Sequence, residues 1–302
     1  MEKIRVAVAG YGHVGREAVE AVTASPDMEL AGVILRNPAK ARELEAERPE
    51  LAVASDVRAL GTVHAAILAV ASRAVPEVAP GYLSRGINTV DSFDIHGPAV
   101  MELRASLDAA AKAGGSVAIV SAGWDPGTDS VVRALMETIA PRGITHTNFG
   151  PGMSMGHTVA IKALEGVEDA LSVTIPIGTG LHRRMIYVKT KPGCDFESVT
   201  ARIKADPYFA HDECWFYPAN DIAALEDMGH GVHMERKGVS GTSHNQRIEF
   251  VMSVMNPAAT AQVMVSAARA STRQKPGCYT LLEIPPIDCL CGEREALLAR
   301  LV

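Results

Sequence analysis

The segment IRVAVAGYGHVG, residues 4–15, gives the clearest indication of how this chain folds. An apolar run typical of a buried strand ends in the pattern G-x-G-x-x-G, and residues 14–23 continue with the apolar spacing of a helix. Gly10 permits a tight turn, Gly12 leaves room for a pyrophosphate, and Gly15 lets the helix pack closely on the strand. This context favours a dinucleotide-binding turn over a plain strand-to-helix connection. We expect cofactor contacts from Gly10, Tyr11, Gly12, His13, Val14 and Gly15.

The residues up to about 120 alternate between apolar runs and helical patterns. Strand runs are predicted at residues 30–35, 65–70, 88–90 and 117–121, with helices between them at 75–85 and 98–113. Strands that are almost continuously apolar and separated by helices indicate a parallel sheet covered on both faces. The sequence therefore predicts an α/β protein with an N-terminal Rossmann domain.

After Gly123 the pattern changes. A helix is predicted at 129–140, and longer strand-like runs follow at 145–149, 171–175, 185–190 and 247–255. Within the last run, four even-numbered apolar residues would share one face of a strand. An alanine-rich helix is predicted at 257–273, with Pro257 near its start. The second half is expected to be an α+β domain built on an antiparallel or mixed sheet.

Composition limits the classes of function. The chain has 302 residues, which fits two domains, and a net charge of −6, which argues against an extended nucleic-acid surface. No apolar run approaches the ~20 residues that a membrane-spanning helix needs, and the N-terminus has no signal-peptide pattern. Five cysteines, all in the second half, favour a reduced, cytoplasmic protein. Cys289 and Cys291 form only C-x-C, which is too little for a zinc site.

The end of the second strand indicates the nucleotide. It reads Ile34-Leu35-Arg36-Asn37 and lacks the acid that accepts a hydrogen bond from the ribose 2′-OH of NAD. Arg36 could instead form a charge-assisted fork with a 2′-phosphate. NADP is therefore preferred to NAD. The alternative is that Arg36 is a solvated surface residue.

Two acidic loops follow strands, where ligands of open α/β sheets bind. Residues 91–96 read DSFDIH and residues 121–127 read SAGWDPG. Carboxylates suit a cationic amine substrate, because an amine must lose a proton before hydride leaves its carbon. Asp94 and Asp125 are the candidates, although Asp125 or Thr128 could simply cap the next helix.

Anion-binding side chains in the second half are Thr174, Arg184 and His230, which only the fold can bring together. Arg184 could equally belong to a solvated basic patch. His230 is predicted in a glycine-flanked loop that suits close approach of a ligand. His230 and His233 form H-x-x-H without a helix pattern or an acid, so no metal site is expected.

The chain resembles the meso-diaminopimelate dehydrogenase family over essentially its whole length. The resemblance is carried by residues 5–16 and 90–96, by GWDPG at 123–127, by FGPGMSMGH at 149–157 and by QKPG at 274–277. The GWDPG and FGPGMSMGH motifs are far more specific than the glycine pattern. The resemblance implies reversible NADP-dependent oxidative deamination of the D-centre of meso-2,6-diaminopimelate. The products would be L-2-amino-6-oxopimelate, with its cyclic imine tetrahydrodipicolinate, and ammonia, within lysine biosynthesis.

The resemblance also implies roles for particular residues. Arg36 would contact the 2′-phosphate and Ser72 would join the cofactor site. Asp94, Trp124 and Asp125 would line the reacting D-centre. The remaining substrate-binding residues would be Phe149, Met155 and Gly156 in the pocket, Thr174, Arg184 and His230 at the distal carboxylate, and Asn256 nearby.

The resemblance further implies that residues from about 277 return to the first domain. The expected domains are therefore 1–122 plus about 277–302 for the dinucleotide, and 123–276 for substrate and for a homo-oligomer, a dimer or higher. Some relatives have a second arginine where this chain has Leu35, and some have Gln in place of Met155. These departures weaken the NADP preference and indicate the more permissive branch, which also aminates 2-keto acids to D-amino acids.

Two other functions remain open from the sequence. A Rossmann reductase could act on a cyclic imine or carbonyl without ammonia, and a non-catalytic protein could sense NADPH. The expected partners are a small amino acid and ammonia, with no nucleic acid and no membrane.

Overall fold

The computed structural model describes residues 3–95, 97–210, 212–226 and 229–302. The chain divides into two compact units, Met1–Val131 with Pro257–Val302, and Val132–Asn256. Within the described residues, no helix combines the length and the apolar character that crossing a bilayer requires.

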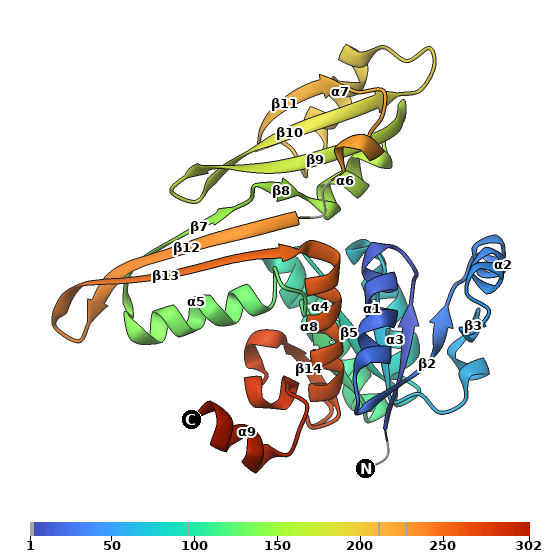
Figure 1. The fold of residues 1–302 in the computed structure, drawn as a ribbon, viewed down its shortest axis with the longest axis vertical. Coiled ribbons are helices and arrows are strands. Elements are labelled where there is room, and N and C mark those ends of the chain that lie inside the picture. The colour runs from blue at the N-terminus through green and yellow to red at the C-terminus, as the bar shows by residue number, and fades with distance from the viewer. Residues whose placement is uncertain (1–2, 96, 211, 227–228) are drawn as a thin grey trace. The chain divides into compact units, whose positions relative to one another are not determined.

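The first unit is built on a parallel sheet of seven described strands in the order β14-β6-β5-β4-β1-β2-β3 (Figure 1). Each strand that the apolar runs predicted is present within a few residues, and the parallel pairing of β1 with β2 and β4 follows the prediction. Its strands are β1 (Ile4–Ala9), β2 (Met28–Ile34), β3 (Val53–Ala54), β4 (Ala65–Leu68), β5 (Asn88–Asp91), β6 (Val117–Val120) and β14 (Gly277–Thr280). The predicted Rossmann fold is confirmed.

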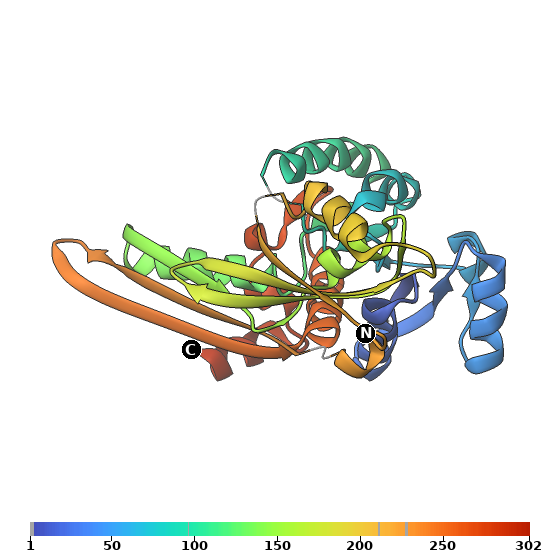
Figure 2. The same cartoon turned by 90° about the horizontal axis from the view of Figure 1, so that it is seen from above.

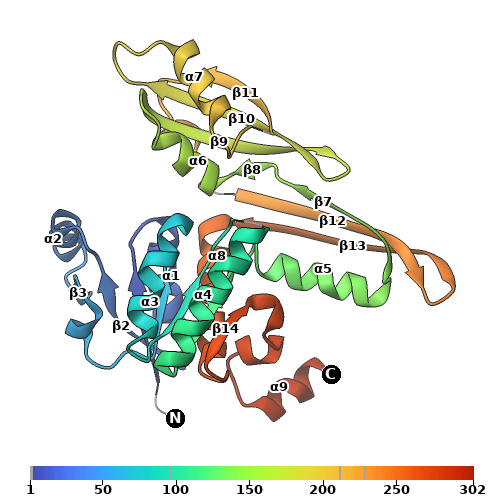
Figure 3. The same ribbon diagram turned by 180° about the vertical axis from the view of Figure 1, so that it is seen from behind.

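Helices cover both faces of this sheet (Figure 3). The apolar residues of α1 (His13–Ala24) and α8 (Asn256–Ser271) join one core with β1 and β6. The helices α3 (Val75–Leu83) and α4 (Pro98–Gly114) join the other. Small residues at Ala267, Ala268 and Ala270 let α8 pack closely, and all three are fully buried.

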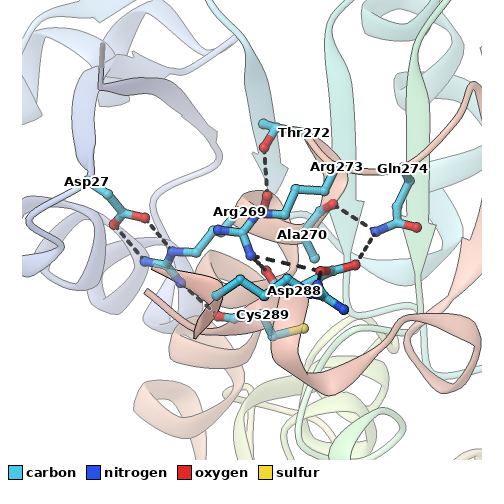
Figure 4. Close-up of polar contacts among 9 residues, drawn as sticks. Asp27, Arg269, Ala270, Thr272, Arg273, Gln274, Asp288 and Cys289 are labelled. Carbon is cyan, nitrogen blue, oxygen red and sulfur yellow. Dashed lines mark hydrogen bonds and ion pairs between the residues drawn. The ribbon is translucent and has the colours of Figure 1, made fainter. Parts of the chain in front are cut away.

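One arginine links helix α8 both to the N-terminal part of the first unit and to the segment that follows β14 (Figure 4). Arg269 of α8 donates to both carboxylate oxygens of Asp27, at 2.5 and 2.8 Å, and to the carbonyl of Cys289 at 2.9 Å. A two-pronged ion pair of this kind is strong, and the Arg269 guanidinium lowers the pKa of Asp27. Asp288 accepts from Gln274 at 3.0 Å, which fixes the turn before the last helix, α9 (Arg294–Leu301).

The second unit has two sheets. One is mixed, in the order β11-β10-β9-β8, with β10 antiparallel to β9 and parallel to β11. The other is antiparallel, in the order β13-β12-β7, and Figure 2 shows its β12–β13 hairpin in orange, curved along its length. The strands are β7 (Arg142–Phe149), β8 (Gly152–Met153), β9 (Val167–Gly178), β10 (Leu181–Thr190), β11 (Glu213–Pro218), β12 (Gly229–Ser240) and β13 (Ser243–Met255).

Helices α6 (Met155–Lys162) and α7 (Phe196–Ala205) build the core of the mixed sheet, with Ile161 and Ile203 packed against Ile186 of β10. The helix α5 (Thr128–Ile139) leads into this unit, and the buried guanidinium of Arg236 on β12 donates to the carbonyl just beyond it, Ala140 O, at 2.8 Å. From Gln246 to Met255 the even-numbered residues of β13 are half-buried and the odd-numbered ones exposed, as the alternation predicted for residues 247–255.

Several features differ from the sequence predictions. Residues 123–131 and helix α8 were assigned to the second domain, but both belong to the first unit, whose core is filled by the alanine-rich face of α8. His230 was predicted in a loop, yet it lies in β12, paired with Val254 of β13. Helix α2 (Pro38–Glu47) was not predicted, because only Leu44 on it is buried, and its start is fixed by the side chain of Asn37, which caps it.

Candidate active site

The glycine turn of the first unit has the geometry that a dinucleotide needs. A side chain at Gly10 would collide with the carbonyl of Ala69, and one at Gly15 with the carbonyl of Gly10, each at 2.3 Å. Gly12, in contrast, has no neighbour within 4 Å of the place of a β-carbon. Helix α1 starts at His13, followed by Val14, and no side chain caps it at Gly12. The open space at Gly12 therefore faces the free N–H groups at the N-terminus of this helix.

Two other expected cofactor residues lie at the surface of the first unit. The Tyr11 ring lies beside the Arg16 guanidinium, and its hydroxyl accepts from Arg48 Nη1 at 3.5 Å. Arg36 is exposed and lines a hollow with Asp56, Tyr82 and Arg85 among its walls. This exposed position is compatible with both alternatives, a contact between Arg36 and an anionic ligand and a solvated surface side chain.

The ends of β1, β4 and β5 form a continuous row. The close approach of Gly10 to Ala69 places the glycine turn beside the loop that follows β4. Ser72 in that loop donates its hydroxyl hydrogen to Asp94 Oδ1 at 2.6 Å, and the Asp94 amide donates back to Ser72 Oγ at 3.2 Å. The candidate acid Asp94 is therefore held next to the glycine turn through two reciprocal hydrogen bonds.

The ends of β5 and β6 are joined by Asp91, which is fully buried. Its Oδ1 accepts from the amides of Phe93 at 2.9 Å and Ser121 at 3.4 Å, and the Ser121 hydroxyl donates to Phe93 O at 2.9 Å. Burial raises the pKa of Asp91 to about 7, although both amides act to lower it. The sequence reading missed this residue, whose only signal was an acid at the end of an apolar strand.

The GWDPG loop is closed on itself. The Gly123 amide donates to Pro126 O at 3.0 Å, and the Thr128 hydroxyl donates to Trp124 O at 3.1 Å. Gly127 leaves no space for a side chain, since a β-carbon there would lie 1.9 Å from Gly123 O. Trp124 is buried and Asp125 is half-buried. The loop thus presents its acid from a fixed backbone, within the first unit that also holds Asp94.

In the second unit, glycines bring the expected substrate residues together. A β-carbon on Gly150 would lie 2.3 Å from the carbonyl of Thr174, and one on Gly152 would lie 2.7 Å from the Cα of His230. The FGPGM segment therefore runs between β9 and β12 with little space to spare. Asn256 Nδ2 donates to Met153 O of the same segment at 3.5 Å. Phe149, Met155 and Gly156 lie at its two ends, and all three are half-buried.

Arg184 is the charged centre of this second-unit cluster. It is paired with Thr174 in the β9–β10 register, and its Nη1 donates to Thr174 Oγ1. Its Nε donates to Asp212 Oδ2 at 2.7 Å, and His157 Nε2 lies 3.8 Å from the same oxygen. The arginine is buried, so the alternative of a solvated basic patch is wrong. The sequence reading missed His157 and Asp212, which are separated from Arg184 by 27 and 28 positions.

The imidazoles around Arg184 are electrically neutral at neutral pH. Burial, assisted by the positive charge of Arg184, lowers the pKa of His157 to about 4 and lowers that of His182 as well. Burial also lowers the pKa of His230, whose Nδ1 lies 3.0 Å from Gly231 O. The neutral imidazoles add no charge, so the formal charges of the cluster are those of Arg184 and Asp212.

The described residues contain no group of three His, Cys, Asp or Glu side chains placed to hold a metal ion. His230 and His233 lie three positions apart on β12, so they point to opposite faces of the sheet. His96, the last residue of the first acidic motif, lies outside the described residues.

Two family models match the chain. The model "Oxidoreductase family, NAD-binding Rossmann fold" matches residues 4–91, and the model "Diaminopimelic acid dehydrogenase C-terminal domain" matches residues 123–256. The two matched regions contain the glycine turn and the Arg184 cluster respectively.

Curated relatives and solved structures cover the full length. The meso-diaminopimelate D-dehydrogenase of Bacteroides fragilis is 55% identical over 302 residues, 100% of both chains. That of Corynebacterium glutamicum is 30% identical over 99% of both. Its structure in complex with DAP superposes with a TM-score of 0.89, at 29% identity and full coverage of both chains. An engineered D-amino acid dehydrogenase bound to NADP+ gives 0.87, at 28% identity over 99% of this chain and 100% of that one.

Proposed function

We propose, because this chain belongs to the meso-diaminopimelate D-dehydrogenase family, that it oxidatively deaminates the D-centre of meso-2,6-diaminopimelate. The products are L-2-amino-6-oxopimelate, with its cyclic imine tetrahydrodipicolinate, and ammonia, and the reversible reaction belongs to lysine biosynthesis. The observation that carries this proposal is the unbroken row of strand ends, from the glycine turn through Ser72 and Asp94 to the Asp125 loop.

The enzyme is a nicotinamide-dependent oxidoreductase. The residues fit the cofactor, since Gly12 leaves open space in front of the uncapped start of α1. Gly10, Tyr11, Gly12, His13, Val14, Gly15 and Ser72 would hold it. We further propose NADP as the cofactor, with Arg36 on the 2′-phosphate, because the hollow beside this exposed arginine gives an anion room to bind.

The two acids perform the proton chemistry. Asp94 and Asp125 bind the ammonium of the D-centre, and one of them takes its proton so that nitrogen can donate its lone pair. The bound nicotinamide supplies the acceptor for hydride. A carboxylate then activates the water that attacks the imine. Trp124 forms part of the loop backbone that fixes Asp125.

The distal end of the substrate is assigned to the second unit. Thr174, Arg184 and His230 would bind the L-centre carboxylate, because a buried guanidinium with hydrogen-bonding neighbours favours a carboxylate. Phe149, Met155, Gly156 and Asn256 would shape the pocket. Met155 packs with the apolar residues Met153 and Leu171, which supports acceptance of less polar 2-keto acids and their amination to D-amino acids.

A spectrophotometric assay tests the reaction. Meso-diaminopimelate with NADP should reduce the nucleotide, whereas the LL isomer should not, because it has no D-centre. In reverse, oxidation of NADPH should require ammonia. Turnover without ammonia would indicate a reductase of imines or carbonyls, and tight NADPH binding without turnover would indicate a sensor. Replacing NADP by NAD in the same assay tests the role of Arg36.

We also propose a homo-oligomer, a dimer or higher, formed through the second unit, and a reducing, cytoplasmic compartment. Ile144, Val251 and Met255 are exposed apolar residues of the antiparallel sheet, with 65%, 71% and 56% of their surface accessible. Surfaces of this kind favour association with a second copy. The five cysteines are all unpaired thiols, as in proteins of reducing compartments. Analytical ultracentrifugation of the chain and of Val251→Glu tests the assembly.

A further inference from the structure

The Arg184 cluster contains a carboxylate of its own. Arg184 Nε donates to Asp212 Oδ2 at 2.7 Å, and the exposed fraction is 9% for the arginine side chain and 22% for the aspartate side chain. Asp212 is therefore the more accessible member of the ion pair. A ligand that reaches Arg184 meets a guanidinium that is already paired with one carboxylate.

The other polar groups of the cluster add hydrogen-bonding capacity but no net charge. His157 and His182 are neutral at neutral pH because burial and Arg184 lower their pKa values. His182 lies two positions from Arg184 on β10, and none of the described residues is a partner of its buried Nδ1. The cluster thus offers one cation, one anion and an unused imidazole nitrogen.

This charge pattern matches one class of end group. An amino-acid end carries an ammonium and a carboxylate on the same carbon, so it can place its anion at Arg184 and its cation at Asp212. A bare carboxylate would also bind Arg184, but it would compete with Asp212 and lie close to a like charge. A pocket that contains its own carboxylate therefore disfavours an end group that lacks the amine.

We propose that Asp212 determines specificity at the distal end of the substrate: it accepts the ammonium of the distal amino-acid group while Arg184 binds the carboxylate. The inference rests on the proposed function, because the L-centre of meso-diaminopimelate is such an end group. Asp212 is then responsible for preferring this diamine over D-2-aminopimelate, which has the same carbon chain and the same reacting centre but no distal amine.

The test compares kcat/KM for the two substrates in Asp212→Asn and in the unaltered enzyme. The preference for meso-diaminopimelate should fall by about tenfold or more, because tenfold corresponds to only about 1.4 kcal/mol of differential binding. Asp212→Glu should keep the preference. Glu213→Gln is the matched control, since Glu213 pairs with Arg183 outside the cluster and should leave the ratio unchanged. If Asp212→Asn lowers both substrates equally, Asp212 only orients Arg184 and the proposal is overturned.

A binding measurement needs no turnover. Calorimetric titration should show that L-2-aminopimelate binds the unaltered enzyme about tenfold more tightly than pimelate, because only the former carries the amino-acid end, and this difference should disappear in Asp212→Asn and persist in Glu213→Gln. Equal affinities would overturn the role of Asp212 even if meso-diaminopimelate is turned over. Absence of turnover with meso-diaminopimelate, together with a preference for L-2-aminopimelate, would contradict the proposed reaction and leave the assignment of Asp212 standing.

Discussion

The acidic loops of the first unit and the Arg184 cluster of the second are held by different kinds of contact. Asp94 is held by the hydroxyl of Ser72 in a neighbouring loop, and the GWDPG loop is closed by hydrogen bonds to its own backbone, such as that from the Gly123 amide to Pro126 O. The Arg184 cluster depends on side chains that meet across the register of a sheet, namely Thr174, Arg184 and Asp212. The first arrangement places an acid accurately for chemistry, and the second allows the charge of a binding pocket to be tuned by one substitution.

The largest effect is expected from Asp125→Asn. Loss of the carboxylate should lower kcat by about 10²- to 10⁴-fold, the range for a general acid or base, while the backbone of the closed loop keeps its shape. Binding of NADPH, followed by fluorescence, should change little, because the glycine turn is untouched. Asp108→Asn is the control, since this half-buried residue of α4 pairs with Lys112 and the Cys278 amide and lies outside both acidic loops. An equal loss of turnover and NADPH binding would contradict a catalytic role for Asp125.

Arg184→Lys should have the next largest effect and should appear in KM. Lysine retains the charge but loses the fork that contacts Thr174 and Asp212 together, so KM for meso-diaminopimelate should rise by about 10- to 100-fold. Arg183→Lys, whose guanidinium lies over the exposed Trp215 ring, is the control with the same change of chemistry. A drop confined to kcat would place Arg184 at the reacting centre instead.

The first unit could be predicted largely from the sequence because its signals are local. The run from Ile4 to Gly15 contains a strand, a turn and a helix, and the structure has all three in place. Helix α2 and the pairing of β3 could not be predicted, since α2 buries only Leu44 and β3 has two residues. The domain assignment of α8 depended on which core its alanines enter, and composition alone does not contain that information.

The Arg184 cluster of the second unit was only partly predictable, because its residues are distant in the sequence and meet only through packing. Family motifs indicated Thr174, Arg184 and His230, and these roles stay predictions. Asp212 and His157 have no local signal, because they meet Arg184 only through the packing of α6 and the segment before β11 against β10. The loop predicted at His230 is a strand because its pairing with β13 is a contact between residues 24 positions apart.

The two regions should also respond oppositely to pH. The folded pKa of Asp91 is raised from 3.8 to about 7, so the native state binds the extra proton and stability is lost as pH rises from about 4 to 7. The folded pKa of His157 is lowered from 6.5 to about 4, so the unfolded chain binds the extra proton and stability is lost as pH falls through the same window.

These opposing slopes become visible only in variants. As pH rises from 5 to 7, Asp91 should lower the free energy of unfolding of the first unit by about 2 kcal/mol, and Asp91→Asn should abolish this decrease. Over the same range His157 should raise the free energy of unfolding of the second unit by about 2 kcal/mol, and His157→Gln should abolish this increase. Amide hydrogen exchange at both pH values, read separately for residues of each unit, measures them. Slopes of the same sign in the two units would contradict the burial of one of these two groups.

The smallest effect compares the glycine-rich segments of the two units. Gly12 has φ −81° and no neighbour within 4 Å of a β-carbon, so Gly12→Ala should change the free energy of unfolding by no more than about 0.5 kcal/mol. Its methyl group would occupy the space assigned to the pyrophosphate, so the Kd for NADPH should rise about tenfold, about 1.4 kcal/mol.

Gly152→Ala is the counterpart in the second unit, because its β-carbon would lie 2.3 Å from Gly229 O and the strain should destabilise that unit by about 1–3 kcal/mol. Thermal melts and NADPH titrations of both variants should therefore show a binding defect in one and a folding defect in the other, since the first glycine keeps space open for a ligand and the second lets two segments of the protein pack.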